Sequence, residues 1–224
     1  MKRHILAYLF LAASLMMFPA ISWAYSFSCS MDDVYSGPNP TGSGPWLKAT
    51  FQDDGTDKVL LTLTALNLKG PEYVSDWFFN FNPSISLSKL SFTYQTGVAP
   101  TSYSTSQNGE YAGGPGYAFD IKIADPNYGN TFGPGDTSTI LITGVNGLTN
   151  LDAADFDYTF NYYGESYLAG AEIQNTDTGW CDNGTTYIGG EDPDPSPAPE
   201  PSTLLILGSG LIGLVGAGKK IRKA

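Results

Sequence analysis

Several carboxylates between residues 25 and 190 are candidates for acid–base chemistry. Two Asp or Glu side chains at a fixed separation can hydrolyse a glycosidic bond without help from histidine. The candidates are Glu72, Asp76, Glu110, Glu165 and Glu172. Their spacing singles out no pair. The sequence therefore leaves open a carbohydrate-active hydrolase that uses two carboxylates, and equally a set of solvated surface acids.

Residues 25–190 contain no histidine and no arginine. The sole histidine is His4, and the arginines are Arg3 and Arg222. Nucleophile triads with a histidine base and zinc sites with histidine ligands therefore cannot be assembled there. The chain has a formal net charge of -11, and the basic side chains of this part are Lys48, Lys58, Lys69, Lys89 and Lys122. Phosphate recognition depends on Lys and Arg, so a nucleic-acid partner is excluded. We predict no catalytic residue and no enzyme activity.

Two runs of aspartates could supply oxygen ligands to a calcium ion, which needs six to eight of them. Neither run has the register of an EF-hand loop, and Asp-Gly is also ordinary hairpin-turn chemistry. We predict no cofactor and leave a structural Ca²⁺ open as the one alternative. Its candidate ligands are Asp53, Asp54, Asp57, Asp152, Asp155 and Asp157.

Tyrosines are more numerous than a single core of this size needs. Aromatic faces can stack on sugar rings while neighbouring Asp and Asn side chains hydrogen-bond the hydroxyls. These residues favour contact with an extracellular polysaccharide, although tyrosine is also common in strands. The candidates are Tyr103, Tyr111, Tyr117, Tyr128, Tyr162, Tyr163 and Tyr167.

The two cysteines, Cys29 and Cys181, lie near the two ends of residues 25–190. In an oxidising compartment they could pair, and a loop of this length would stabilise the domain by about 4 to 5 kcal/mol. We predict this disulfide, with two thiols as the alternative.

The elements that must carry these residues are strands, because no segment has a sustained helical period. Apolar and polar residues alternate at sandwich spacing, and Gly, Pro, Asn and Asp separate the runs. We predict strands at residues 46–52, 58–68, 74–82, 85–95, 117–123, 138–143, 156–163, 167–173 and 185–188, with loops at 36–45 and 96–116. The expected fold of residues 25–190 is an all-β, antiparallel, jelly-roll-like β-sandwich of eight or nine strands.

The N-terminus predicts export. Basic residues at positions 2–4 precede an apolar run over residues 5–18, and Ser22 and Ala24 provide the small residues that a cleavage site requires. We predict that residues 1–24 are a signal peptide with a helical apolar region. Signal peptidase is expected to cut between Ala24 and Tyr25.

The C-terminus has three parts in a fixed order. Pro199, Glu200, Pro201 and Ser202 end a stalk of acidic residues and prolines at 191–201. A glycine-rich apolar stretch at 202–218 has the length of a short single transmembrane helix, and the basic tail at 219–224 should stay in the cytoplasm. An ordinary membrane anchor is the alternative.

This order resembles the PEP-CTERM sorting domain, also called the ice-binding protein C-terminal domain, a name that implies nothing about ice here. The resemblance implies a Gram-negative bacterium that makes exopolysaccharide. It also implies an exosortase as partner, with the chain held in the membrane before processing and placed on the cell surface or in the extracellular matrix afterwards.

Taken together, these features predict a non-enzymatic surface or matrix protein whose sandwich binds glycan or other surface components. Two alternatives stay open: a secreted hydrolase with two carboxylates, and an inert adhesive scaffold.

Overall fold

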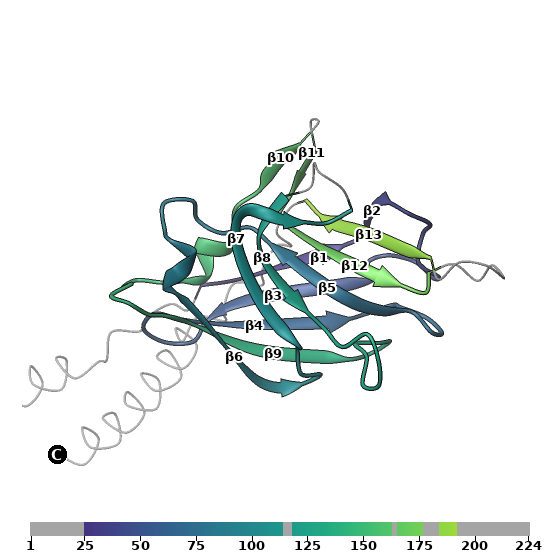
Figure 1. Ribbon diagram of the computed structural model, residues 1–224, viewed down its shortest axis with the longest axis horizontal. Coiled ribbons are helices and arrows are strands. Elements are labelled where there is room, and N and C mark those ends of the chain that lie inside the picture. The colour runs from purple at the N-terminus through teal and green to yellow at the C-terminus, as the bar shows by residue number, and fades with distance from the viewer. Residues whose placement is uncertain (1–24, 114–117, 163–164, 177–183, 192–224) are drawn as a thin grey trace, which may run out of the picture.

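A computed structural model describes residues 25–113, 118–162, 165–176 and 184–191, which form two antiparallel sheets packed face to face (Figure 1). The predicted all-β sandwich is confirmed. The five-stranded sheet, called sheet A, has the order β1 (Ser26–Met31), β3 (Leu47–Asp53), β4 (Lys58–Ala65), β9 (Thr137–Gly144), β6 (Leu90–Gly97).

The six-stranded sheet, called sheet B, covers one face of sheet A. Its order is β2 (Asp33–Ser36), β13 (Thr185–Gly190), β12 (Ala169–Gln174), β5 (Tyr73–Phe79), β8 (Ala118–Ala124), β7 (Ser102–Tyr111). A separate hairpin consists of β10 (Phe160–Tyr162) and β11 (Glu165–Tyr167), and two short 3-10 helices are η1 (Leu87–Lys89) and η2 (Ala153–Phe156).

Alternation builds the core. In β4, Val59, Leu61 and Leu63 are fully buried while the residues between them are partly exposed, as expected for a strand with one face on the core. Phe51 of sheet A meets Phe79 of sheet B edge to face, with ring centroids 5.3 Å apart. Aromatic contacts of this kind join the two layers and exclude water from the space between them.

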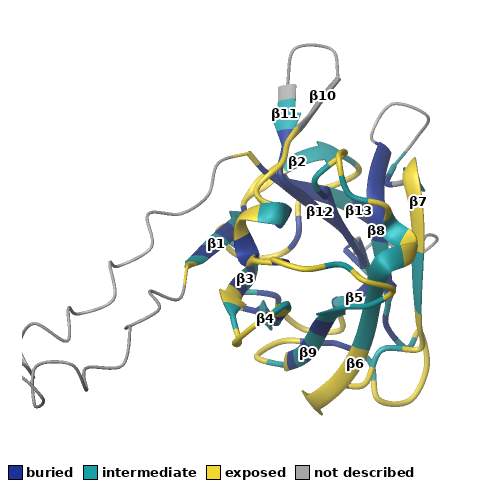
Figure 2. Ribbon diagram, turned by 90° about the vertical axis from the view of Figure 1, so that its left-hand side faces the viewer, coloured by how far each residue is buried: buried dark blue, intermediate teal, exposed yellow. Residues whose placement is uncertain are grey.

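The predicted loop at 96–116 is wrong, because these residues contain β7. This strand is at the edge of sheet B and is mostly exposed (Figure 2). Most of its residues are polar, so its sequence lacks the alternation that marks a half-buried strand. Strands β1 and β2 also went unpredicted. The described residues therefore hold more strands than the eight or nine expected.

A second aromatic cluster lies against sheet B and consists of Phe78, Ala112, Phe119 and Tyr167, with Tyr35 and Tyr187 packed on it. Glycines in the sheet make room for these rings. A Cβ at Gly170 would lie 3.0 Å from the Phe119 ring, and one at Gly189 would lie 2.3 Å from the Tyr167 ring. The cluster borders the polar site described below.

The signal helix, the transmembrane helix and all but the first residue of the stalk fall on residues 1–24 and 192–224, outside the described ranges. Within those ranges, no helix has the length and apolar character needed to cross a membrane.

Candidate functional site

A β-bulge in β5 brings two of the candidate carboxylates together. Glu172 of β12 pairs with Asp76, but the next residue, Ile173, pairs with Val74, so Ser75 is the extra residue. The bulge keeps both Val74 and Trp77 on the core side while Asp76 reaches the partly exposed face. Bulges often redirect a side chain beside a functional site.

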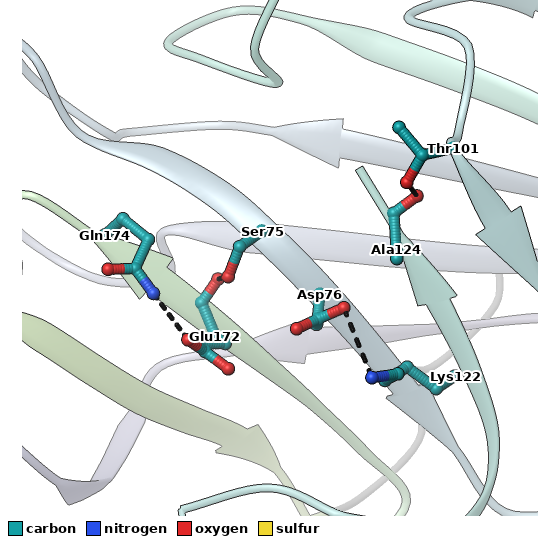
Figure 3. A network of polar contacts seen from close by, with 7 residues as sticks. All are labelled: Ser75, Asp76, Thr101, Lys122, Ala124, Glu172 and Gln174. Atoms are coloured by element: carbon teal, nitrogen blue, oxygen red, sulfur yellow. Dashed lines mark hydrogen bonds and ion pairs between the residues drawn. The ribbon is translucent and has the colours of Figure 1, made fainter. Parts of the chain in front are cut away.

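The pair Asp76 and Glu172 lies at the centre of a polar network on sheet B (Figure 3). Lys122 of β8 places its Nζ 3.9 Å from Asp76 Oδ1. Gln174 donates from Nε2 to Glu172 Oε1, and Ser75 donates from Oγ to the backbone oxygen of Glu172 at 3.4 Å. The carboxylate of Asp76 is thus held from β8, and that of Glu172 from its own strand.

Burial is the main electrostatic effect at this site. It raises the pKa of Asp76 to about 6, against the lowering influence of Lys122. The charge of Glu172, and a hydrogen bond between the two carboxyl groups, raise the pKa further.

Tyrosines flank the pair. Tyr187 of β13 lies opposite Glu172 in register. Burial, the charge of Glu172 and a hydrogen bond to it raise the pKa of Tyr187 to about 12. The pKa of Tyr73 is also raised, by burial first and then by Tyr128 and Glu172. The site therefore combines carboxylate acceptors, an amide, an ammonium group and neutral phenols.

The arrangement can recognise hydroxyl groups. Asp76 and Glu172 pair across β5 and β12, and the interaction of the two carboxyl groups is one cause of the raised pKa of Asp76. Carboxylates and tyrosines on one strand face can accept and donate hydrogen bonds to a sugar.

The other candidate carboxylates do not join the pair directly. Glu72 is 2 % exposed and accepts hydrogen bonds from the backbone N–H groups of Thr41 and Lys69, so it fixes two loops. Glu110 of β7 is a further, weaker influence that raises the pKa of Asp76. The side chain of Glu165 is outside the described part of the chain.

The two runs of calcium candidates meet at one end of the sandwich. Asp53 Oδ1 accepts the Ala153 N–H at 2.8 Å, and Asp57 accepts the Asn150 N–H. Asp54 is exposed in the turn after β3. In the described ranges, no group of three or more His, Cys, Asp or Glu side chains is arranged to hold a metal ion. The calcium hypothesis stays untested.

Three of the tyrosines nominated from the sequence have described side chains, and these three do not form a common platform. Tyr103 stacks on Phe92 with ring centroids 5.2 Å apart, and Tyr167 is buried. Tyr128 is 92 % exposed and is the one that acts electrostatically on the site through Tyr73. The side chains of the other four are not described.

A second polar groove lies beside the bulged middle of β7 and is lined in part by Asn80, Gln107, Asn108, Asp120 and Tyr158. Its buried polar atoms already serve the fold. Asn80 donates to the Tyr167 backbone oxygen at 2.8 Å, and Asp120 accepts the N–H groups of Phe81 and Asn108. We therefore place the candidate site at Asp76 and Glu172.

Of the two cysteines in the predicted disulfide, the structure describes Cys29. Cys29 is buried, and a Cβ on Gly190 would lie 2.4 Å from its Sγ. Cys181 is outside the described residues. Gly184, three positions after it, lies at the opposite end of β13 from Gly190, about 20 Å away at the usual rise of a strand.

The pairing of Cys29 with Cys181 therefore stays a prediction with a direct test. Intact mass of natively exported protein, measured without reductant and after thiol alkylation, should show no added alkyl groups. Two added groups would contradict the disulfide.

Sequence reasoning missed Lys122, Gln174 and Tyr187, which complete the site. Lys122 and Tyr187 reach Asp76 and Glu172 only through sheet pairing, whereas Gln174 lies two residues after Glu172 on β12. The alternation around Lys122 was a usable signal, because it placed this lysine on a solvated strand face. The register that joins β8, β5, β12 and β13 could not be read from one chain.

Residues 197–222 match the PEP-CTERM protein-sorting motif. The match confirms the resemblance drawn from Pro199, Glu200 and Pro201, and it supports an exported surface protein that an exosortase sorts. The motif lies in residues that the structure does not describe, as do the predicted cleavage residue Ala24 and the residue Ser202. The chain matches no curated protein and no solved structure.

Proposed function

We propose that this exosortase-sorted surface protein binds extracellular polysaccharide, without cleaving it, through the polar face of sheet B around Asp76 and Glu172. The observation that carries the proposal is the pair Asp76 and Glu172, which β5 and β12 bring together across the sheet and which Tyr187 and Gln174 flank. Such a set can hydrogen-bond sugar hydroxyls.

The charge of the chain restricts the class of polysaccharide that it can bind. With a net charge of -11, the protein repels a polyanion unless a divalent cation lies between them. A neutral polysaccharide meets no such barrier. We therefore expect neutral polymers to be retained without calcium and acidic polymers only with it.

The proposal predicts that Glu172→Gln weakens retention on immobilised neutral polysaccharide about tenfold or more. A hydrogen bond to a charged group contributes about 1.5 to 3 kcal/mol, and 1.4 kcal/mol is a factor of ten in affinity. Retention of the exported protein is measured on a panel of neutral and acidic polymers, with Ca²⁺ or with chelator. Asp54→Asn is the matched control, because Asp54 is an exposed carboxylate outside the site.

A hydrolase screen on the same polymers decides between the proposal and its alternatives. Release of sugar that Asp76→Asn or Glu172→Gln abolishes would establish the hydrolase with two carboxylates. Equal retention of the native protein and Glu172→Gln would remove the site from polymer binding. Failure to bind any polymer would leave the adhesive scaffold.

A further inference from the structure

Four carboxylates gather at the end of the sandwich where the chain enters β1. We call Asp53, Asp152, Asp155 and Asp157 the acidic corner. Asp53 ends β3, and the other three lie in and beside η2, which the hydrogen bond from the Ala153 N–H to Asp53 Oδ1 ties to β3. The pKa of Asp152 is raised, by burial first and then by the charges of Asp155 and Asp53. A cation in this corner would relieve that repulsion.

The backbone nitrogen of Tyr25 lies in the corner. It donates to Asp53 Oδ2 at 2.7 Å, and the Asp53 N–H donates in return to the Tyr25 backbone oxygen at 3.0 Å. The phenol oxygen of Tyr25 lies 3.4 Å from Asp157 Oδ2. Two carboxylates of the corner thus contact Tyr25, one at its backbone nitrogen and the other at its phenol.

Tyr25 is also the residue that the predicted signal-peptidase cut places at the start of the chain. Before the cut, its nitrogen is a neutral amide with one hydrogen. Hydrolysis adds the hydroxyl of a water molecule to the Ala24 carbonyl carbon and the hydrogen to the Tyr25 nitrogen. The resulting amine takes a further proton at neutral pH, since an α-amino group has a pKa of about 7.7 to 8.0.

We propose that the acidic corner is a binding site for the α-ammonium group that signal peptidase creates at Tyr25, so that removal of the leader itself stabilises the folded domain. The cut converts the backbone nitrogen of Tyr25 from a neutral donor into a charged one, and this nitrogen already donates to Asp53. Hydrogen bonds with an ionised partner are roughly twice as strong as neutral ones.

The experiment moves the ammonium group away while every residue of the corner is kept. Gly-Ser-Gly is inserted between Ala24 and Tyr25 of the full chain, which displaces the new terminus by up to about 10 Å. The protein is exported in a Gram-negative host and extracted in detergent, and its first residue is established by intact mass. The melting temperature of the domain is then compared with that of the native chain.

We expect the insertion to lower the melting temperature at pH 6.5 by about 2 to 4 °C, the effect of roughly 1 kcal/mol in a domain of this size. Combined with Asp53→Asn, the insertion should change it by less than a third of that amount, because the acceptor of the ammonium group has lost its charge. Asp54→Asn, an equal charge change on the neighbouring exposed residue, should leave the effect of the insertion intact.

The pH dependence separates an ammonium group from a merely bulky addition. Asp53, Asp152, Asp155 and Asp157 all favour the charged amine, so its pKa in the folded state lies above the unfolded value. The stabilisation is then fully present below about pH 7.7 and is lost as the pH rises through the folded pKa. The difference between native and inserted proteins should therefore vanish by about pH 10.

Several outcomes would overturn the proposal. They are a mature chain that begins at a residue other than Tyr25, equal melting temperatures at pH 6.5, and a difference that persists unchanged at pH 10 or in the Asp53→Asn background. A calcium site in the corner is the remaining alternative. It would show as Ca²⁺ raising the melting temperature of the inserted protein to the native value, whereas the proposal expects no such rescue.

Discussion

Asp125→Asn is expected to raise the melting temperature by about 5 to 10 °C at pH 8 and to leave it nearly unchanged at pH 4. Asp125 is 3 % exposed, and burial raises its pKa to about 7, against the lowering effect of a hydrogen bond from Trp77 Nε1 at 2.9 Å. The charge of Asp76 raises it further. Asp125 Oδ1 has no hydrogen-bond partner among the described residues.

The sign of the pH dependence follows from linkage. Asp125 is an acid whose folded pKa is raised above its unfolded value, so the folded state binds its proton more tightly. Stability therefore falls as the pH rises from about 4 to about 7 and is constant above that. The neutral amide of Asn never becomes a buried charge, and its oxygen can still accept from Trp77. The buried charge should lower the free energy of unfolding at pH 8 by a few kcal/mol, since one pKa unit corresponds to about 1.4 kcal/mol.

Melting curves of the native protein and Asp125→Asn between pH 4 and pH 8 test this prediction. Asp120→Asn is a contrasting control in β8, the strand that ends just before Asp125, because Asp120 accepts the N–H groups of Phe81 and Asn108 and an amide nitrogen can accept neither. That variant should be destabilised throughout the range. Parallel curves for native protein and Asp125→Asn would show that Asp125 carries no buried charge at pH 8.

Alanine at Pro199, Glu200 and Pro201 is expected to abolish processing, leaving the full-length protein in the membrane fraction. These three residues lie within the matched sorting motif and immediately precede its apolar stretch. The measurement is the mass and the cellular fraction of the protein in a host with an active exosortase. Because the substitutions lie outside residues 25–190, they should not alter the melting temperature of the domain.

A control replaces Pro193 and Pro195 by alanine, which changes the acidic, proline-rich stretch but keeps every residue of the matched motif. This variant should be processed normally. Normal processing of the variant without Pro199, Glu200 and Pro201 would contradict their role in sorting.

Strands whose alternation is strong could be predicted from the sequence, and strands at sheet edges could not. The run at 58–68 has apolar residues at every second position because β4 lies between β3 and β9 with one face on the core. β7 offers both faces to solvent for much of its length, so its Ser, Thr and Gln residues resemble a loop. The bulge at Ser75 also breaks the period within β5.

The candidate site could be predicted only as a set of residue types. Asp76 and Glu172 were both candidates, yet they are far apart in the chain and meet only because β12 pairs with β5. Pairing of strands distant in sequence depends on the whole topology, which periodicity does not contain. The sorting motif is the opposite case, because its residues are contiguous and their order alone carries the signal.

The position of β13 within sheet B affects how the domain responds to a pulling force. β13 is the last described strand before the sorting segment, and it lies between β12 and β2 rather than at an edge. Hydrogen bonds between antiparallel strands run perpendicular to the strand axis. Tension along β13 therefore shears its bonds to both neighbours together, whereas an edge strand would peel away one bond at a time. A force applied along β13 from its C-terminal end thus has to break hydrogen bonds to two strands at once.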